Sequence, residues 1–137
     1  MKWQLSTGKI INFNTRPFMI DWDKKAPSKG AQATKDFLKK HCFVQYIGEE
    51  VKVPGARLFC DFVLWSLKVA IEFDGLGVHD EYNKHFHKSR AGFLRSIKRD
   101  CAKDDHFERN GFQMIRITED DLPLTKEFFS VNYEVYL

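Results

Sequence analysis

Three carboxylates interrupt an otherwise apolar stretch of the chain, CDFVLWSLKVAIEFDG at residues 60–75. They are Asp61, Glu72 and Asp74, and burying a charge without a partner is costly. Side chains alternate across a strand, and a two-residue turn at Ser66–Leu67 would fold the stretch into a hairpin. In that register Asp61 lies directly opposite Glu72, roughly 5 Å away at Cβ. Asp74 follows on the same face.

Two opposed carboxylates repel each other, so this arrangement needs a compensating charge. A hard divalent cation provides one, because Mg²⁺ takes oxygen ligands and accepts one or two carboxylates together with waters and phosphate oxygens. The pattern therefore predicts a Mg²⁺ (or Mn²⁺) site held by Asp61, Glu72 and Asp74. The alternative is a pair of salt bridges, to Lys68 or Arg116, with the hairpin at a sheet edge.

His79 lies five residues beyond Asp74, in a polar stretch that leaves the strand. A histidine there could accept a proton from an attacking water, since its pKa is near working pH. The alternatives are plainer: His79 could be an exposed loop residue, and Asp74–Gly75 could be only a turn signal.

A basic block follows, KHFHKSRAGFLRSIKRDCAK at residues 84–103, in which Asp100 is the single acid. Its cations are Lys84, Lys88, Arg90, Arg95, Lys98, Arg99 and Lys103. One such block on a chain of net charge +3 favours a polyanion partner. A solvated helix face without a partner is the alternative.

Helical spacing predicts how this block is presented. Phe93, Leu94, Ile97 and Cys101 form an apolar stripe. On the far face Lys88, Arg95, Arg99 and Lys103 can meet successive phosphates. Asp100 lies between the two faces, where it could pair with Lys103 or orient a histidine or a second metal.

The 137 residues, 43% of them hydrophobic, fit one domain with an irregular lead at 1–27, a core at 28–118 and a C-terminal helix and tail at 119–137. No apolar run is long enough to span a membrane, and the N-terminus lacks a signal-peptide pattern. Three cysteines without a C-x-x-C pair exclude a disulfide framework and fit a reducing cytoplasm.

The elements expected in the core alternate in type. Ser28 caps a helix to about His41, CFVQYI and the carboxylate hairpin supply strands, and a helix over about 86–109 stops at Asn110–Gly111. FQMIRI is a further strand and 124–132 a closing helix. The order α-β-β-β-α-β-α predicts an α/β fold, a mixed sheet with flanking helices.

This combination resembles the PD-(D/E)XK nuclease superfamily, closest to the branch of very-short-patch repair and EDxHD homing endonucleases. The resemblance is carried by CDFVLWSLKVAIEFDGLGVH, SIKRD at 96–100 and ERNGFQMIRIT at 108–118. It implies a restriction-endonuclease-like core in which Asp61 is the central metal ligand and His79 the general base. Asp100 would match the last acid of the EDxHD pattern, and Glu72 and Asp74 fall on the strand that bears the (D/E)XK element.

Two positions depart from the family pattern. Asp74 replaces the usual lysine, so Lys98 or another helix cation would have to stabilise the charge that develops on the phosphate. Ala31 stands in SKGAQ where the family commonly places a glutamate. Ala31 is open to three interpretations: core packing, a natural loss of activity, or an introduced change that inactivates the enzyme. Because most of the remaining pattern is intact, the third is favoured, and this chain itself would then cleave poorly.

The function expected from these residues is a Mg²⁺-dependent DNA endonuclease, of homing type, in the cytoplasm of a bacterial or phage-infected cell. Alternatives are a non-catalytic DNA-binding module on a nuclease scaffold, a Holliday-junction resolvase and a mismatch nickase. A third class is an interaction protein that pairs subunits through the aromatic tail FFSVNYEVYL. A homodimer is compatible with the first, because cutting two strands needs two sites or two visits.

Overall fold

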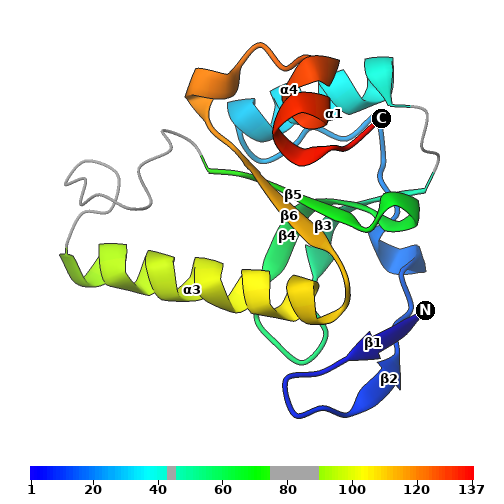
Figure 1. Cartoon of the computed structure of the whole chain (residues 1–137), viewed down its shortest axis with the longest axis vertical. Helices are drawn as coiled ribbons and strands as arrows, with labels where there is room; N and C mark the ends of the chain where they lie inside the picture. The colour runs from blue at the N-terminus through cyan, green and yellow to red at the C-terminus, as the bar shows by residue number, and fades with distance from the viewer. Residues whose placement is uncertain (43–45, 75–89) are drawn as a thin grey trace.

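The computed structural model describes residues 1–42, 46–74 and 90–137 (Figure 1). Its strands are β1 (Lys2–Gln4), β2 (Ile10–Asn12), β3 (Ile47–Lys52), β4 (Phe59–Leu64), β5 (Val69–Phe73) and β6 (Gln113–Ile117). Its α-helices are α1 (Lys29–His41), α3 (Arg90–Arg109) and α4 (Lys126–Tyr133). The predicted order of core elements, α-β-β-β-α-β-α, is confirmed for these residues.

The centre of the molecule is a four-stranded mixed sheet with the order β3-β4-β5-β6. β3, β4 and β5 are antiparallel neighbours, and β6 runs parallel to β5 because α3 lies between them in the chain. Figure 1 shows α1 and α4 on one side of this sheet and α3 on the other. The predicted α/β class, a mixed sheet flanked by helices, is therefore confirmed.

The helix predicted after Ser28 is present, and its cap is the expected one. The Ser28 side chain accepts a hydrogen bond from the Ala31 amide at 3.1 Å. Leu38 is fully buried in an apolar cluster with Ile71 of β5 and Phe129 of α4. This cluster is the core on the α1 side of the sheet.

The first strand of the central sheet lies later in the chain than CFVQYI at 42–47, which was expected to form a strand. GEEVKVPGA at 48–56 was expected to be a strand or loop, and β3 begins at Ile47 and runs through GEEVK to Lys52. Glu49 supplies the physical reason, because its buried carboxylate is paired with Lys35 of α1 and so tolerates the interior of the fold. Residues 43–45 lie outside the described part of the chain.

The carboxylate hairpin has the predicted register but a longer turn. Phe62 pairs with Ile71 and Leu64 with Val69, the pairing expected for this hairpin. The chain turns through a 3-10 segment, Trp65–Leu67, which ends at Lys68 with a left-handed φ of 56°. A four-residue connection thus preserves the register that a two-residue turn would also give.

The inner face of α3 differs from the predicted apolar stripe. Leu94 is 54% exposed and Cys101 is exposed, whereas Phe107 is 1% exposed. Lys103 and Asp100 are partly buried and occupy the sheet-facing side. The stripe prediction was wrong for Leu94 and Cys101, because charged partners on the sheet draw polar side chains of α3 inward. Ile97 is partly buried, and the side chain of Phe93 lies outside the described residues.

The second core cluster lies on the α3 side and includes the N-terminal hairpin. Trp3 of β1 is 1% exposed and packs edge-on against Phe107 of α3 and Phe13. β1 and β2 pair antiparallel, so the predicted strand near 9–13 exists and has a partner that sequence reasoning did not find. No helix in the described part of the chain is long and apolar enough to cross a membrane.

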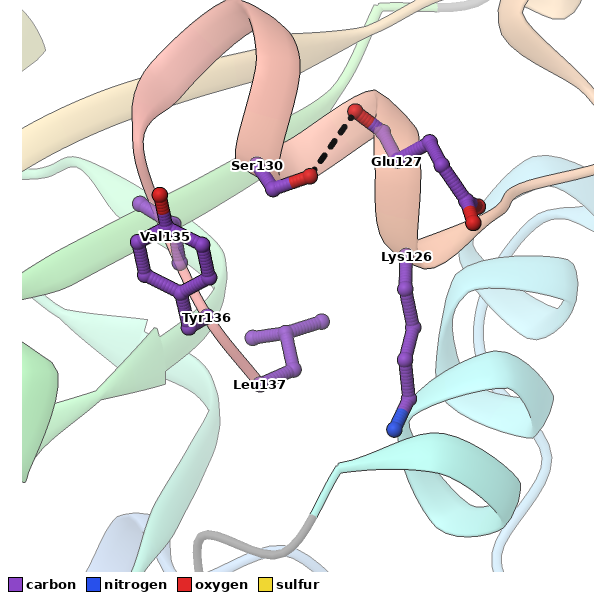
Figure 2. Close-up of a pocket in the computed structure, with 6 residues that line it drawn as sticks. All are labelled: Lys126, Glu127, Ser130, Val135, Tyr136 and Leu137. Carbon is purple, nitrogen blue, oxygen red and sulfur yellow. Dashed lines mark hydrogen bonds between the residues drawn. The ribbon is translucent and has the colours of Figure 1, made fainter.

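The C-terminal tail folds back beneath α4 and leaves a recess there. Val135 is buried, whereas Tyr136 is 75% exposed. Figure 2 shows the residues that line the recess: Lys126, Glu127, Ser130, Val135, Tyr136 and Leu137. This recess contains one carboxylate side chain and is separate from the acidic hairpin, whose Glu72 faces α3. Subunit pairing through this tail stays a prediction.

Candidate functional site

Asp61 and Glu72 lie on neighbouring strands, close enough for each side chain to affect the pKa of the other. The described register of β4 and β5 ends at Phe62–Ile71, and Asp61 and Glu72 are the next residues on the two strands; their direct opposition stays a prediction. Glu72 is 5% exposed and Asp61 is half-buried. One Asp61 oxygen, Oδ2, also accepts a hydrogen bond from the Phe73 amide at 2.8 Å. Two acids therefore share one side of the sheet.

The ammonium group of Lys103 contacts this pair from α3. Its Nζ lies 2.5 Å from Glu72 Oε1, and the Lys103 side chain is 14% exposed. The sequence placed Lys103 on the solvent face with the DNA-binding cations, and that placement was wrong. Lys103 precedes the buried Phe107 by one turn, and this spacing is the signal that could have placed it on the inner face.

Burial raises the pKa of both carboxyl groups. For Glu72 the pKa rises to about 8, because burial and the neighbouring Asp61 charge outweigh the attraction of Lys103 and Arg116. Burial likewise raises the pKa of Asp61, against the hydrogen bond from the Phe73 amide and the charge of Lys103. Near neutral pH this pair therefore lacks enough positive charge to keep both groups ionised easily.

Asp74 points to a different partner. Its Oδ1 lies 3.3 Å from Arg116 Nη1, which is one of the salt bridges that the sequence offered as an alternative to a metal. Lys68, the other partner considered, instead lies over the Phe112 ring at 4.8 Å from its centroid. The Arg116 guanidinium also contacts Asp104 Oδ1 at 2.7 Å and the Asp100 backbone oxygen at 3.2 Å.

Outward-facing cations of α3 form a separate group. Arg95, Lys98 and Arg99 are exposed and line a surface recess together with Ala102. This arrangement matches the predicted exposure of Arg95 and Arg99. The predicted residues His79, Lys84 and Lys88 lie outside the described residues, as does the side chain of Arg90, the first residue of α3.

The carboxylate oxygens of Asp61 and Glu72 suit a hard cation that needs few ligands from the protein. Within residues 1–42, 46–74 and 90–137, no three His, Cys, Asp or Glu side chains gather closely enough to hold a metal ion. The expected trio is thus not assembled, since the Asp74 carboxylate contacts Arg116. Asp61 and Glu72 remain as two neighbouring carboxylates, and Mg²⁺ needs no more than one or two beside waters and phosphate oxygens.

Ala31 belongs to the apolar core rather than to a polar site. It is 2% exposed and lies in the cluster with Leu38 and Ile71, whereas Glu72, the next residue of β5, faces α3. Side chains alternate across a strand, so Ile71, which packs with Ala31, and Glu72 lie on opposite faces of the sheet. Of the three interpretations of Ala31, this placement favours core packing.

A buried ion pair on the α1 side escaped sequence reasoning. Lys35 is 1% exposed, and its Nζ lies 2.9 Å from Glu49 Oε1. The same ammonium donates to the backbone oxygens of Asp21 and Lys24. Its position on the helix, four residues after the buried Ala31, was the available signal. This lysine fastens the segment before α1 to the helix and to β3.

Neither a scan of protein-family models nor a search of curated proteins finds a match to this chain.

Proposed function

We propose that this chain is a Mg²⁺-dependent DNA endonuclease built on a restriction-endonuclease-like core. One observation carries the proposal: the Asp61 and Glu72 carboxyl groups interact on adjacent strands, with Lys103 Nζ 2.5 Å from Glu72. Two carboxylates and a lysine on one side of a sheet form a constellation suited to phosphodiester hydrolysis. The lysine comes from α3 instead of from the strand.

Each side chain has a part in that reaction. Asp61 and Glu72 would hold the ion through their carboxylate oxygens. When bound, the ion supplies Lewis-acid chemistry, which polarises a phosphoryl oxygen and makes water a stronger acid. Lys103 would donate to a phosphate oxygen as negative charge develops on it. This is the role that the sequence assigned to Lys98 or to another cation of the helix. His79 keeps its proposed role as the base that takes the proton from water.

The exposed cations of α3 would hold the DNA backbone. Arg95 and Arg99 are four residues apart, so they are neighbours on the helix surface. Lys98 follows Arg95 by three residues and is exposed as well. Phosphate contacts of this kind fix the register of a nucleic acid without reading its sequence. Binding should therefore weaken with rising salt.

The decisive experiment measures cleavage of plasmid, mismatched and branched DNA with Mg²⁺ or Mn²⁺ by the wild-type chain, Asp61→Asn and Glu72→Gln. Cleavage is expected from the wild type only, with a loss of at least about 100-fold in either variant. Glu108→Gln is the matched control and should cleave like the wild type, because Glu108 is an exposed acid at the C-terminal end of α3. Equal cleavage by all four proteins, or none from the wild type on any substrate, would overturn the proposal.

A second candidate is a non-catalytic DNA-binding module on the same scaffold. It is favoured by the contacts already made to the acids, since Lys103 neutralises Glu72 and Arg116 neutralises Asp74. This candidate predicts salt-dependent DNA binding that ignores both Mg²⁺ and Asp61→Asn. Fluorescence anisotropy with labelled duplex, with and without Mg²⁺, separates it from the endonuclease.

A further inference from the structure

The middle of α3 is held to the sheet by ionic contacts, whereas its C-terminal end is held by apolar ones. Phe107 is 1% exposed and packs against Trp3 at a ring-centroid distance of 5.5 Å. One and two turns earlier, the sheet-facing side chains are Lys103 and Asp100, which are partly buried. Apolar packing therefore fixes one end of the helix, and charged contacts must set its position further along.

Arg116 of β6 makes most of those charged contacts. Its guanidinium reaches Asp104 Oδ1 at 2.7 Å, the Asp100 backbone oxygen at 3.2 Å and Asp74 Oδ1 at 3.3 Å. Asp100 and Asp104 are one turn apart on α3, so the Arg116 side chain contacts two successive turns of the helix. Asp74 ties the same group to the end of β5.

The contacts of Arg116 with α3 lie on both sides of Lys103 along the chain. Lys103 adjoins Asp104 and follows Asp100 by three residues, and Arg116 pairs in register with Glu72 on the parallel strands. We propose that Arg116 is a positioning residue, which fixes the rotation and height of α3 so that Lys103 reaches Glu72. Its meaning for catalysis rests on the proposed endonuclease function, but the positioning itself does not.

The geometry requires arginine at this place. A guanidinium is a planar fork with five donors, which can serve three acceptors that lie in different directions. A lysine would carry the same charge, but its charge is concentrated in one ammonium group, which would not extend as far toward each of the three acceptors. Arg116→Lys should therefore preserve the local charge and lose most of the positioning.

The test measures how fast Lys103 is acetylated in the folded protein by a water-soluble amine reagent, with mass spectrometry as the readout. In the wild type this lysine is protected by its contact with Glu72. In Arg116→Met its modification should be faster by on the order of tenfold, because a charged hydrogen-bonded contact is lost. Arg116→Lys should show most of that increase, and Asp104→Asn a smaller one.

Two controls separate positioning from general loosening. Arg109→Met removes an exposed arginine from the end of the same helix and should leave Lys103 protected. Lys35, which is 1% exposed on the other side of the sheet, must stay protected in every variant. If Arg116→Met also exposes Lys35, the milder Arg116→Lys and Asp104→Asn decide. Unchanged protection of Lys103 in those folded variants overturns the proposal.

DNA cleavage supplies a second, separable readout. Arg116→Lys should lower kcat while KM for DNA stays within about twofold, because the exposed cations that hold DNA are unaltered. A lowered kcat with unchanged Lys103 protection contradicts positioning. Faster acetylation without any cleavage in the wild type leaves positioning standing and removes the endonuclease function.

Discussion

The Lys103 ammonium lies 2.5 Å from Glu72 Oε1, so one cation from α3 serves two neighbouring carboxylates of the sheet. The second carboxylate, Asp61, has its Oδ2 on the Phe73 amide. This cation does not fully compensate the two acids, because burial and then the Asp61 charge raise the pKa of Glu72 in spite of it. A cation bound beside the two carboxylates would favour their ionised forms.

Glu72 should make the protein less stable as pH rises. The Glu72 pKa is about 8 in the folded chain against 4.5 as its ordinary value, so the folded state binds the proton more tightly. The stabilisation is complete below about pH 4.5 and is lost as pH rises through about 8, by roughly a few kcal/mol. Urea denaturation across this range should show a flatter pH dependence for Glu72→Gln.

The matched control for this titration is Glu108→Gln, because the Glu108 side chain is exposed and should leave the pH dependence unaltered. A direct check is a carbon-13 NMR titration of the Glu72 carboxyl, with a midpoint expected near 8. A midpoint in the usual range for glutamate would contradict the account.

Lys103→Met should destabilise the fold in a pH-dependent way. At pH 5 Glu72 is protonated, and the loss of its partner costs little. At pH 9 both acids are ionised without a cation, and the cost should approach the ~3–5 kcal/mol seen when one member of a buried pair is removed. Chemical denaturation at the two pH values measures this difference. Lys98→Met, an exposed change on the same helix, should be neutral at both; equal losses at pH 5 and pH 9 for Lys103→Met would refute the prediction.

Lys35→Met should destabilise the protein at neutral pH by ~3–5 kcal/mol, because it leaves the buried Glu49 carboxylate without its cation. The double variant Lys35→Met with Glu49→Leu should recover much of that loss, since an apolar pair can replace a buried ion pair. Equilibrium denaturation of the four proteins forms a double-mutant cycle. A coupling energy near zero would show that the pair is not an energetic unit.

Ala31→Glu should lower stability, because it places a carboxylate in an apolar cluster where the present side chain is 2% exposed. The melting temperature measures this. Ala33→Glu is the matched control, two residues on in α1 at a partly exposed position. If Ala31→Glu instead kept its stability and increased Mg²⁺-dependent cleavage, Ala31 would be an inactivating residue and the core interpretation would be wrong.

Local sequence signals predicted much of the fold. Ser28 before an amphipathic run gave the start of α1, and the period of two along both strands gave the register that brings Asp61 and Glu72 together. Asn110–Gly111 marked the end of α3. Each of these signals depends on residues that are near in the chain, and for that reason they could be recognised.

Contacts between distant residues could not be predicted in the same way. Nothing local to Lys103 or Arg116 says that one meets Glu72 and the other meets two acids of α3. The apolar stripe predicted on α3 does not hold for Leu94 and Cys101, because residue type alone does not show that the sheet surface opposite the helix is charged. The pairing of Lys35 with Glu49 also joins residues that are distant in the chain, and it was missed for the same reason.

The mixed attachment of α3 gives this helix two opposite responses to salt. Around Phe107 its contacts are apolar, and excluded salts such as sulfate strengthen apolar contacts. Around Arg116 its contacts are between charges that are partly accessible, and dissolved ions screen them. A sulfate salt therefore tightens one end of the helix while it loosens the middle, so the solvent composition itself sets how firmly α3 lies along the sheet.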